Sequence, residues 1–257
     1  MIEQTVLQIS SIDIPYLLFI FSFIAGFFDA IAGGGALILI PVLLINGFSA
    51  SNTVAQNKLI GTPGAVVSML FFIKHRQIDW KTVLVGFPLT LVGALIGAHT
   101  ISMISDDVAE YCVLILLPIA ALFLWKYRCV SLVNQRNAAS KFLIIAFLFI
   151  GFYDGFFGPG TGCLLILTLS NLKGLSLLKS AGTAKVFNAT TNVAALTVFL
   201  MNDSVMIAVG LVLALANILG NLVGSKIAMF YGEKIVRNAI IFMLPILVIT
   251  IFYRAIV

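Results

Sequence analysis

Two aspartates interrupt long uncharged stretches of the sequence. Asp29 is the only charged residue between Ile14 and Asn57, and Asp154 is the only acid in a later apolar run. A carboxylate in apolar surroundings is costly, so such a residue is a candidate functional group. Each aspartate either caps a neighbouring loop or helix through its N–H groups, or binds a coupling proton or cation, since desolvation favours the protonated carboxyl.

Two lysines lie in equally unusual positions. Lys58 and Lys185 are about 12 Å inside helices that we expect to begin near residues 50 and 176, at about 1.5 Å per residue. Each lysine either extends its ammonium group to an interface or presents it to a buried anion. Four neutral polar residues on or near the same helices can add hydrogen-bond donors: Asn57, Thr183, Asn188 and Asn192.

A glycine-rich segment follows each aspartate. The two segments are Gly33-Gly34-Gly35 and Gly158-Pro159-Gly160-Thr161-Gly162. Such runs lower helix propensity and let the backbone turn. A helix that begins directly after the turn presents unpaired N–H groups, which bind anions, and Thr161 can add a hydroxyl. The alternative is that the glycines only allow helices to cross closely.

These features occur twice because the chain contains an internal repeat. Asp29 and Asp154 are 125 residues apart, and after a two-residue insertion the separation becomes 127 residues. The residue pairs at this second spacing are Gly47/Gly174, Ser49/Ser176, Lys58/Lys185, Phe72/Phe199, Gly93/Gly220, Gly97/Gly224 and Pro118/Pro245. The four-residue spacing of the later glycines is typical of close helix contacts. We therefore interpret the chain as two homologous halves.

The composition shows what kind of elements must position these residues. The chain is 61% hydrophobic and 10% charged with a mean hydropathy of +1.15, whereas soluble domains carry about 25% charged residues. We predict an all-α integral membrane protein with one transmembrane domain over 1–257, divided into repeat 1 (about 12–128), a basic linker (129–140) and repeat 2 (about 141–257). Soluble enzymes, nucleic-acid binders and secreted disulfide scaffolds are excluded.

The charges of the loops predict that the two halves have opposite orientations. Loop 74–81 carries three basic residues and its counterpart 201–208 carries only Asp203, whereas loop 102–107 is acidic and its counterpart 226–237 is basic. Because basic loops favour the cytoplasmic side, equivalent loops should lie on opposite sides of the membrane. Such inverted repeats require an odd number of crossings in each half.

We predict that each half is a broken-helix hairpin with a Gly-rich turn, followed by three transmembrane helices. In the first half the helices are expected near 14–31, 36–46, 50–73, 82–101 and 108–125. Both termini then face outward. The alternative is one kinked span in place of each hairpin, which gives parallel repeats. The sequence does not decide whether the hairpins turn at depth or span the membrane.

Other chemistry finds no support in the sequence. It contains no phosphate-binding loop, dinucleotide fingerprint or zinc-protease motif, and neither His75 nor His99 has partners at metal-ligand spacing. We therefore expect no enzymatic activity, no cofactor, no metal and no nucleic-acid partner. The expected partners are the lipid bilayer, a small anionic substrate and a coupling proton or sodium ion, and an oligomer is compatible with the sequence.

Several of these segments resemble the sulfite exporter TauE/SafE family. They are GFFDAIAGGG (26–35) with Pro41, the Ile78-Asp79-Trp80 loop, GFYDGFFGPGTG (151–162), and Ala184-Lys185 with Asn188 and Asn192. The resemblance covers nearly the whole chain and implies a multi-pass permease of a bacterial or archaeal inner membrane. Its implied substrates are small sulfur-containing anions, such as sulfite or sulfonates, or related organic acids. Lys58 matches the family pattern less well than Lys185 does.

We therefore expect a secondary transporter that works by alternating access, with its anion site between the inverted halves. The predicted substrate-binding residues are Gly33, Gly34, Gly35, Asn57, Lys58, Gly158, Gly160, Thr161, Gly162, Thr183, Lys185, Asn188 and Asn192. Asp29 and Asp154 are predicted to serve coupling or loop capping. An anion channel with the same central site, or a permease for another small organic anion, is the alternative.

Overall fold

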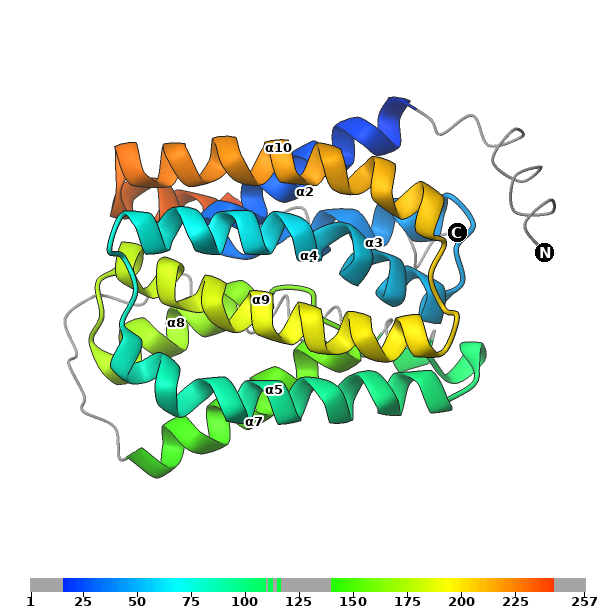
Figure 1. The fold of residues 1–257 in the computed structure, drawn as a ribbon, viewed down its shortest axis with the longest axis horizontal. Coiled ribbons are helices and arrows are strands. Elements are labelled where there is room, and N and C mark those ends of the chain that lie inside the picture. The colour runs from blue at the N-terminus through cyan, green and yellow to red at the C-terminus, as the bar shows by residue number, and fades with distance from the viewer. Residues whose placement is uncertain (1–15, 110, 113–114, 117–139, 243–257) are drawn as a thin grey trace.

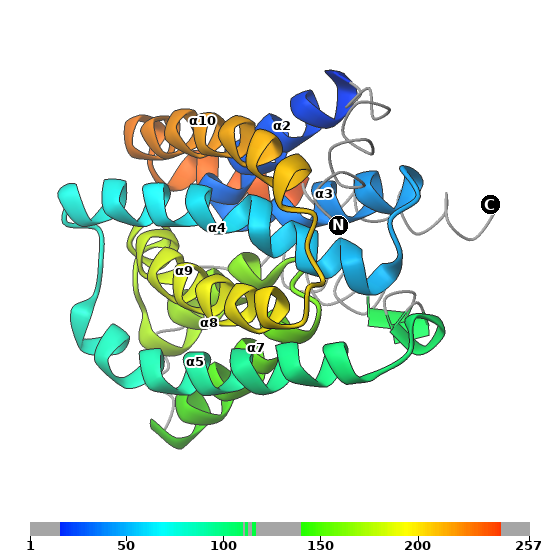
Figure 2. The same cartoon turned by 45° about the vertical axis from the view of Figure 1, so that its right-hand side comes forward.

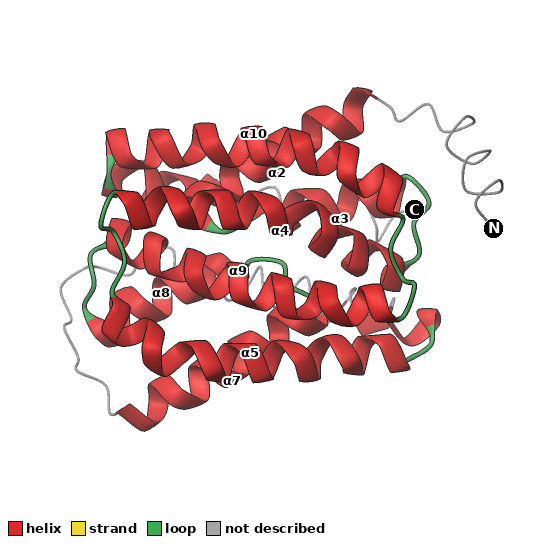
Figure 3. Ribbon diagram, viewed as in Figure 1, coloured by secondary structure: helices red, strands yellow, loops and turns green. Residues whose placement is uncertain are grey.

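The described part of the chain is helical throughout (Figure 3). The structure is a computed structural model, and it describes residues 16–109, 111–112, 115–116 and 140–242. Its main helices are α2 (Tyr16–Ala32), α3 (Gly35–Ile45), α4 (Ala50–Lys74), α5 (Trp80–Met103), α7 (Ser140–Phe156), α8 (Thr161–Lys173), α9 (Leu177–Met201) and α10 (Ile207–Tyr231). The predicted helices of the first half agree closely with α2 to α5. The predicted span near 108–125 falls largely outside the described residues.

The two predicted helix breaks are present. The first separates α2 from α3 at Gly33 and Gly34, and Gly33 has a φ of 69°, a left-handed conformation that glycine adopts without strain. The second separates α7 from α8, with φ of 96° at Gly158 and 78° at Gly160. Both breaks are buried inside the protein, the setting in which irregular backbone is tolerated at membrane depth.

The helices form a layered bundle in which the two halves are intertwined. Both views place α4 and α9 between an outer α2–α10 pair and an outer α5–α7 pair (Figures 1 and 2). Because α2 and α5 belong to the first half and α7 and α10 to the second, each outer pair joins helices of different halves. In Figure 1, α4 runs in the opposite direction to its counterpart α9, and α5 in the opposite direction to α10.

Glycines allow the outer pairs to pack backbone against backbone. A Cβ on Gly220 of α10 would lie 2.0 Å from the carbonyl oxygen of Phe23 in α2, and one on Gly93 of α5 would lie 2.4 Å from that of Leu148 in α7. Gly224 and Gly97 make the corresponding contacts one turn further on. The prediction that these glycines serve helix contacts is confirmed.

The outer surface is apolar. Leu84, Phe149 and Leu215 are 62–76% exposed on α5, α7 and α10, while Lys58, Lys185 and Asp154 are buried inside. Three of the described helices, α5, α9 and α10, are long and apolar enough to cross a membrane, and α2, α3, α8 and residues 142–156 are shorter apolar helices. This distribution of apolar and polar side chains is that of a membrane protein, as the composition predicts.

The two ends of the bundle differ in charge. The helix ends and loops at the end where α4 stops and α5 starts (Figure 1), here called the basic end, carry nine Lys and Arg residues in the described chain: Lys74, Arg76, Lys81, Lys141, Lys173, Lys179, Lys226, Lys234 and Arg237. The opposite end, here called the acidic end, carries Asp106, Asp107 and Asp203 and, within the described residues, no Lys or Arg. The loops α4–α5 and α9–α10 therefore lie at opposite ends. Both termini, for which an outward orientation is predicted, fall outside the described residues.

Candidate functional site

Two ion pairs link the halves at the centre of the bundle. Nζ of Lys58 in α4 donates to Oδ1 of Asp154 in α7 at 2.9 Å, and Nζ of Lys185 in α9 donates to Oδ2 of Asp29 in α2 at 2.7 Å. The lysine of each half thus pairs with the aspartate of the other half. Asp29 is the counterpart of Asp154 in the sequence repeat, and Lys58 is the counterpart of Lys185. The two ion pairs are therefore counterparts of each other.

The Lys58–Asp154 pair is almost completely buried. The side chains of Lys58 and Asp154 are 1% and 3% exposed. Lys58 also donates to Oδ1 of Asn192 at 2.9 Å, and the hydroxyl of Thr191 donates to the second carboxylate oxygen of Asp154. A Cβ on Gly158 would lie 3.2 Å from the lysine Nζ, so the glycine lets the ammonium group approach the second helix break.

The Lys185–Asp29 pair has fewer partners and more exposure. The side chains of Lys185 and Asp29 are 3% and 15% exposed. Beyond the lysine, Asp29 accepts a long hydrogen bond of 3.5 Å from Nδ2 of Asn188. Two pairs that are equivalent in the repeat therefore have different surroundings, because α9 supplies Asn188, Thr191 and Asn192 where α4 has Gly61, Gly64 and Ala65.

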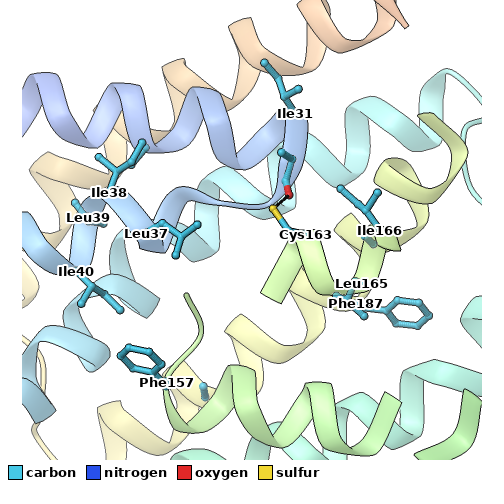
Figure 4. Packing of buried hydrophobic residues seen from close by; sticks show 14 of the residues in the cluster. Ile31, Leu37, Ile38, Leu39, Ile40, Phe157, Cys163, Leu165, Ile166 and Phe187 are labelled. Carbon is cyan, nitrogen blue, oxygen red and sulfur yellow. Dashed lines mark hydrogen bonds between the residues drawn. The ribbon is translucent and has the colours of Figure 1, made fainter. Parts of the chain in front are cut away.

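The two helix breaks touch each other beside these pairs. The N–H of Gly162 donates to the carbonyl oxygen of Gly33 at 3.2 Å, and a Cβ on Gly33 would lie 2.2 Å from the Cα of Gly162. Next to this contact, Sγ of Cys163 donates to the carbonyl oxygen of Ala32 at 3.0 Å (Figure 4). Buried apolar residues, including Leu37, pack around the junction (Figure 4). The two breaks therefore form one contact, here called the joint, at the centre of the protein.

A cavity lies between the joint and the ion pairs. Its volume is about 30 Å³, which is room for only a few water molecules or a compact ion. Eleven of the predicted site residues line it: Asp29, Gly33, Gly35, Asn57, Lys58, Asp154, Gly158, Thr161, Gly162, Asn188 and Asn192. The structure thus brings most of the predicted site together, while their role in binding stays a prediction.

Four predicted site residues are not part of the cavity lining. They are Gly34, Gly160, Thr183 and Lys185. Lys185 contacts the site through Asp29, which does line the cavity. Thr183 instead accepts from the N–H of Asp79 at 2.9 Å, just before α5 begins. Its repeat counterpart Gln56 accepts from the N–H of Met206 at 3.0 Å, just before α10 begins, so this pair of residues positions helices.

The aspartates and the glycine segments differ in detail from what the sequence suggests. No side chain caps α3 or α8, and the hydrogen bonds that both carboxylates accept in the described chain come from the side chains named above. At the second break, Thr161 N–H donates to Gly158 O at 3.1 Å and Gly162 N–H donates to Gly33 O. The Thr161 hydroxyl also donates to Gly158 O, at 2.7 Å. The cradle of free N–H groups expected at α8 is therefore partly occupied.

Sequence reasoning missed four residues of the cavity lining: Ala36, Leu39, Gly61 and Asn217. Asn217 is the informative one. It is 3% exposed and lies within the apolar helix α10. A buried asparagine in an apolar span is unusual enough to be a signal, and it has no polar amide counterpart in the first half, where Thr90 occupies the equivalent place.

The site has the chemistry of a balanced ionic cluster. Two ammonium groups and two carboxylates sum to zero charge, so the aspartates balance the positive charge of the two buried lysines. Buried charges persist only when they are paired and hydrogen-bonded, and each lysine here has an aspartate partner. Such a cluster can bind an ion only by exchanging one of its own partners for it.

The sequence is similar to one protein family and to several curated membrane proteins. The sequence model described as sulfite exporter TauE/SafE matches residues 18–251. A probable membrane transporter protein of Haemophilus influenzae is 35% identical over 236 residues, covering 90% of this chain and 92% of that protein. The probable membrane transporter protein YfcA of Escherichia coli K12 is 34% identical over 227 residues, covering 88% and 84%. A probable membrane transporter protein of Sinorhizobium, ORF9, is 36% identical over 226 residues, covering 87% of each.

No solved structure matches the chain. The matched range of the family model, residues 18–251, spans both helix breaks and both ion pairs, and each of these relatives covers more than four fifths of this chain. The expected family is thereby confirmed, and with it the broad class of a multi-pass membrane transporter. The chain belongs to the sulfite exporter TauE/SafE family.

Proposed function

We propose that this protein is a secondary transporter that moves a small sulfur-containing anion, such as sulfite or an organosulfonate, across the inner membrane by alternating access. The observation that carries the proposal is the pair of buried lysines, each joined to an aspartate of the other half, around a central cavity. Ammonium groups and amide N–H donors form strong, charge-assisted bonds with oxyanions. The small cavity favours a compact anion.

Charge balance supports coupling to a cation. An anion that enters the neutral cluster of Asp29, Lys58, Asp154 and Lys185 adds one uncompensated buried charge for each of its negative charges, which is strongly unfavourable. Protonation of one aspartate restores neutrality and frees its lysine for the anion. We therefore propose that each negative charge crosses together with one proton, with a sodium ion as the alternative coupling ion.

The arrangement of the helices supports inverted repeats and alternating access. Counterpart helices run in opposite directions, and the loops α4–α5 and α9–α10 lie at opposite ends (Figure 1). Because basic loops favour the cytoplasm, the basic end is proposed to face inward. Both ion pairs and the contact between the breaks join the two halves, so rocking of one half against the other alters the site directly, as in other transporters with inverted repeats.

Transport into liposomes tests the function. We expect purified protein to take up labelled sulfite or a simple alkanesulfonate with saturable kinetics and to show counter-exchange when the lumen is preloaded with the same anion. If transport is coupled to protons, acidifying the outside should accelerate anion uptake. Large unitary currents without counter-exchange would instead establish the rival function, an anion channel that uses the same site.

Ligand-induced thermal stabilisation tests the site. A panel of sulfite, sulfonates, sulfate and small carboxylates should raise the melting temperature of the parent protein for at least one anion, and stabilisation by carboxylates alone would favour a permease for another organic anion. Because Lys185→Ala alone leaves Asp29 unpaired, the matched variant is Lys185→Gln with Asp29→Asn, which keeps the volumes and removes both charges. A parent-like anion response of this double variant would contradict the assignment of the lysine.

A further inference from the structure

A row of buried polar residues lies on the face of α10 that packs against α4. Asn217, Asn221 and Ser225 follow one another at every fourth residue, and they are 3%, 0% and 0% exposed. Residues four apart lie on the same face of a helix, about 6 Å from one to the next. The row begins at the central cavity, which Asn217 lines, and proceeds about 12 Å toward the basic end.

The middle of this row contains an unsatisfied polar atom. Nδ2 of Asn221 donates to the carbonyl oxygen of Asn217 at 3.1 Å and to its Oδ1 at 2.9 Å. Because both partners are acceptors, the amide orientation of Asn221 is fixed. Its Oδ1 is buried and has no hydrogen-bond partner among the described residues. An unpaired buried acceptor costs about 1–3 kcal/mol, so we expect a hydrogen-bond donor such as water beside this oxygen.

The middle member of the row differs from its neighbours in its bonding. Nδ2 of Asn217 donates to the carbonyl oxygen of Ser22 in α2 at 3.2 Å, the kind of bond that holds membrane helices together. Asn221 bonds only within its own helix. On the facing side of α4, Gly64 leaves room for the amides, since a Cβ there would lie 2.3 Å from Oδ1 of Asn217 and 2.4 Å from Nδ2 of Asn221. One turn further, Ser68 of α4 and Ser225 share a hydrogen bond of 2.9 Å, so both helices present hydroxyls.

The equivalent face of the first half lacks such a row. The counterparts of Asn217, Asn221 and Ser225, 127 residues earlier in α5, are Thr90, Ala94 and Ala98. The backbone of Ala94 instead packs against Gly155, where a Cβ would lie 2.1 Å from its carbonyl oxygen. The polar row therefore breaks the symmetry of the repeat, and it leads to one end of the bundle only.

We propose that the α4–α10 interface is a hydrated polar path that connects the central cavity with the basic end. Its ligand is water, held first at Oδ1 of Asn221, and through water it carries protons to and from the cluster of Asp29 and Asp154. The delivery of protons rests on the proposed function, whereas the hydration of the path does not.

Cysteine accessibility tests the path without any substrate. In a background with Cys112, Cys129 and Cys163 replaced by alanine, Asn221→Cys and Ser225→Cys are compared with the matched α5 variants Ala94→Cys and Ala98→Cys. The probe is the small reagent methanethiosulfonate ethylammonium, added to vesicles that expose the basic end. We expect the α10 cysteines to react about tenfold faster than the α5 cysteines, because a hydrated thiol ionises and reacts more readily.

Equal labelling rates in the two helices would overturn the proposal. Ser225→Cys changes the side chain so little that the fold should be kept, so a rate equal to that of Ala98→Cys would be sufficient to overturn it. A second measurement follows proton uptake during anion transport. Asn221→Leu keeps the branched shape without the polar atoms and should slow proton uptake about tenfold while the anion-induced thermal shift remains, whereas Asn221→Ser should restore uptake. Parent-like proton uptake in Asn221→Leu would also overturn it. Fast labelling of α10 in a protein that transports no anion would preserve the path and refute the proposed function.

Discussion

Removing one partner of the Lys58–Asp154 pair should destabilise the protein strongly. Lys58→Met keeps the length of the apolar stem and deletes the charge. It leaves Asp154, whose side chain is 3% exposed, with the hydroxyl of Thr191 but without an ammonium partner. It also deprives Oδ1 of Asn192 of its donor at 2.9 Å.

The size of the effect follows from the burial of the pair. Breaking a buried ion pair costs about 3–5 kcal/mol, because the remaining charge is uncompensated, whereas replacing both partners with apolar residues is often neutral. We therefore expect Lys58→Met to lose about 3–5 kcal/mol and the double variant Lys58→Met with Asp154→Leu to recover most of that loss. Lys185→Met should cost less, because the side chain of Asp29 is 15% exposed and can be solvated more easily.

Reversible unfolding in mixed detergent micelles measures these free energies. Four proteins form a double-mutant cycle: the parent, the two single variants and the double variant, with Lys185→Met as the comparison at the equivalent position. The reasoning is refuted if Lys58→Met is as stable as the parent, or if the double variant is no more stable than the single ones. Loss of transport in the double variant alongside recovered stability would separate folding from function.

Three further tests use substitutions at the helix break, at a pair of equivalent hydrogen bonds and at Asp29. Gly33→Ala places a Cβ on a left-handed residue and within 2.2 Å of the neighbouring break. At Gly47, which is also left-handed, an added Cβ would meet no atom within 4 Å. Gly47→Ala should therefore lose only about 1–2 kcal/mol in the same unfolding assay, and Gly33→Ala should lose more. Gln56→Leu and Thr183→Val remove equivalent hydrogen bonds and should each cost about 0.5–1.5 kcal/mol; clearly unequal losses would argue against equivalent roles. Asp29→Asn leaves the cluster with one surplus positive charge, so anion uptake into liposomes should respond to membrane voltage and lose its acceleration by external acid, and retention of the parent's pH response would count against coupling at Asp29.

The sequence predicts the frame of the fold well. Asp29, Lys58, Asp154 and Lys185 are recognisable because charges in apolar runs are rare, and the repeat spacing relates them in pairs. The helix breaks are equally visible, because three successive glycines at 33–35 cannot continue a helix at low cost. The close packing of Gly93 and Gly220 follows from the four-residue spacing of small residues.

The partners of these residues could not be predicted. Spacing shows that Lys58 and Lys185 are equivalent, but it does not show that each reaches across to the aspartate of the other half, because that depends on how the halves intertwine. Thr183 illustrates the same limit: its place two residues before Lys185 suggests a ligand, yet its hydroxyl accepts from the N–H of Asp79. Asn217 enters the cavity from α10, a helix that carries no charge near its centre to draw attention to it.

The two equivalent ion pairs differ in how easily they can open. Lys58–Asp154 is held by Asn192 and Thr191 and is nearly sealed, while Lys185–Asp29 is more exposed and has one long additional hydrogen bond. A pair with fewer partners opens at lower cost, so an arriving anion should displace Asp29 before Asp154. If the proposed function holds, the sealed Lys58–Asp154 pair and the contact between the two helix breaks keep the halves together while the Lys185–Asp29 pair exchanges its partner.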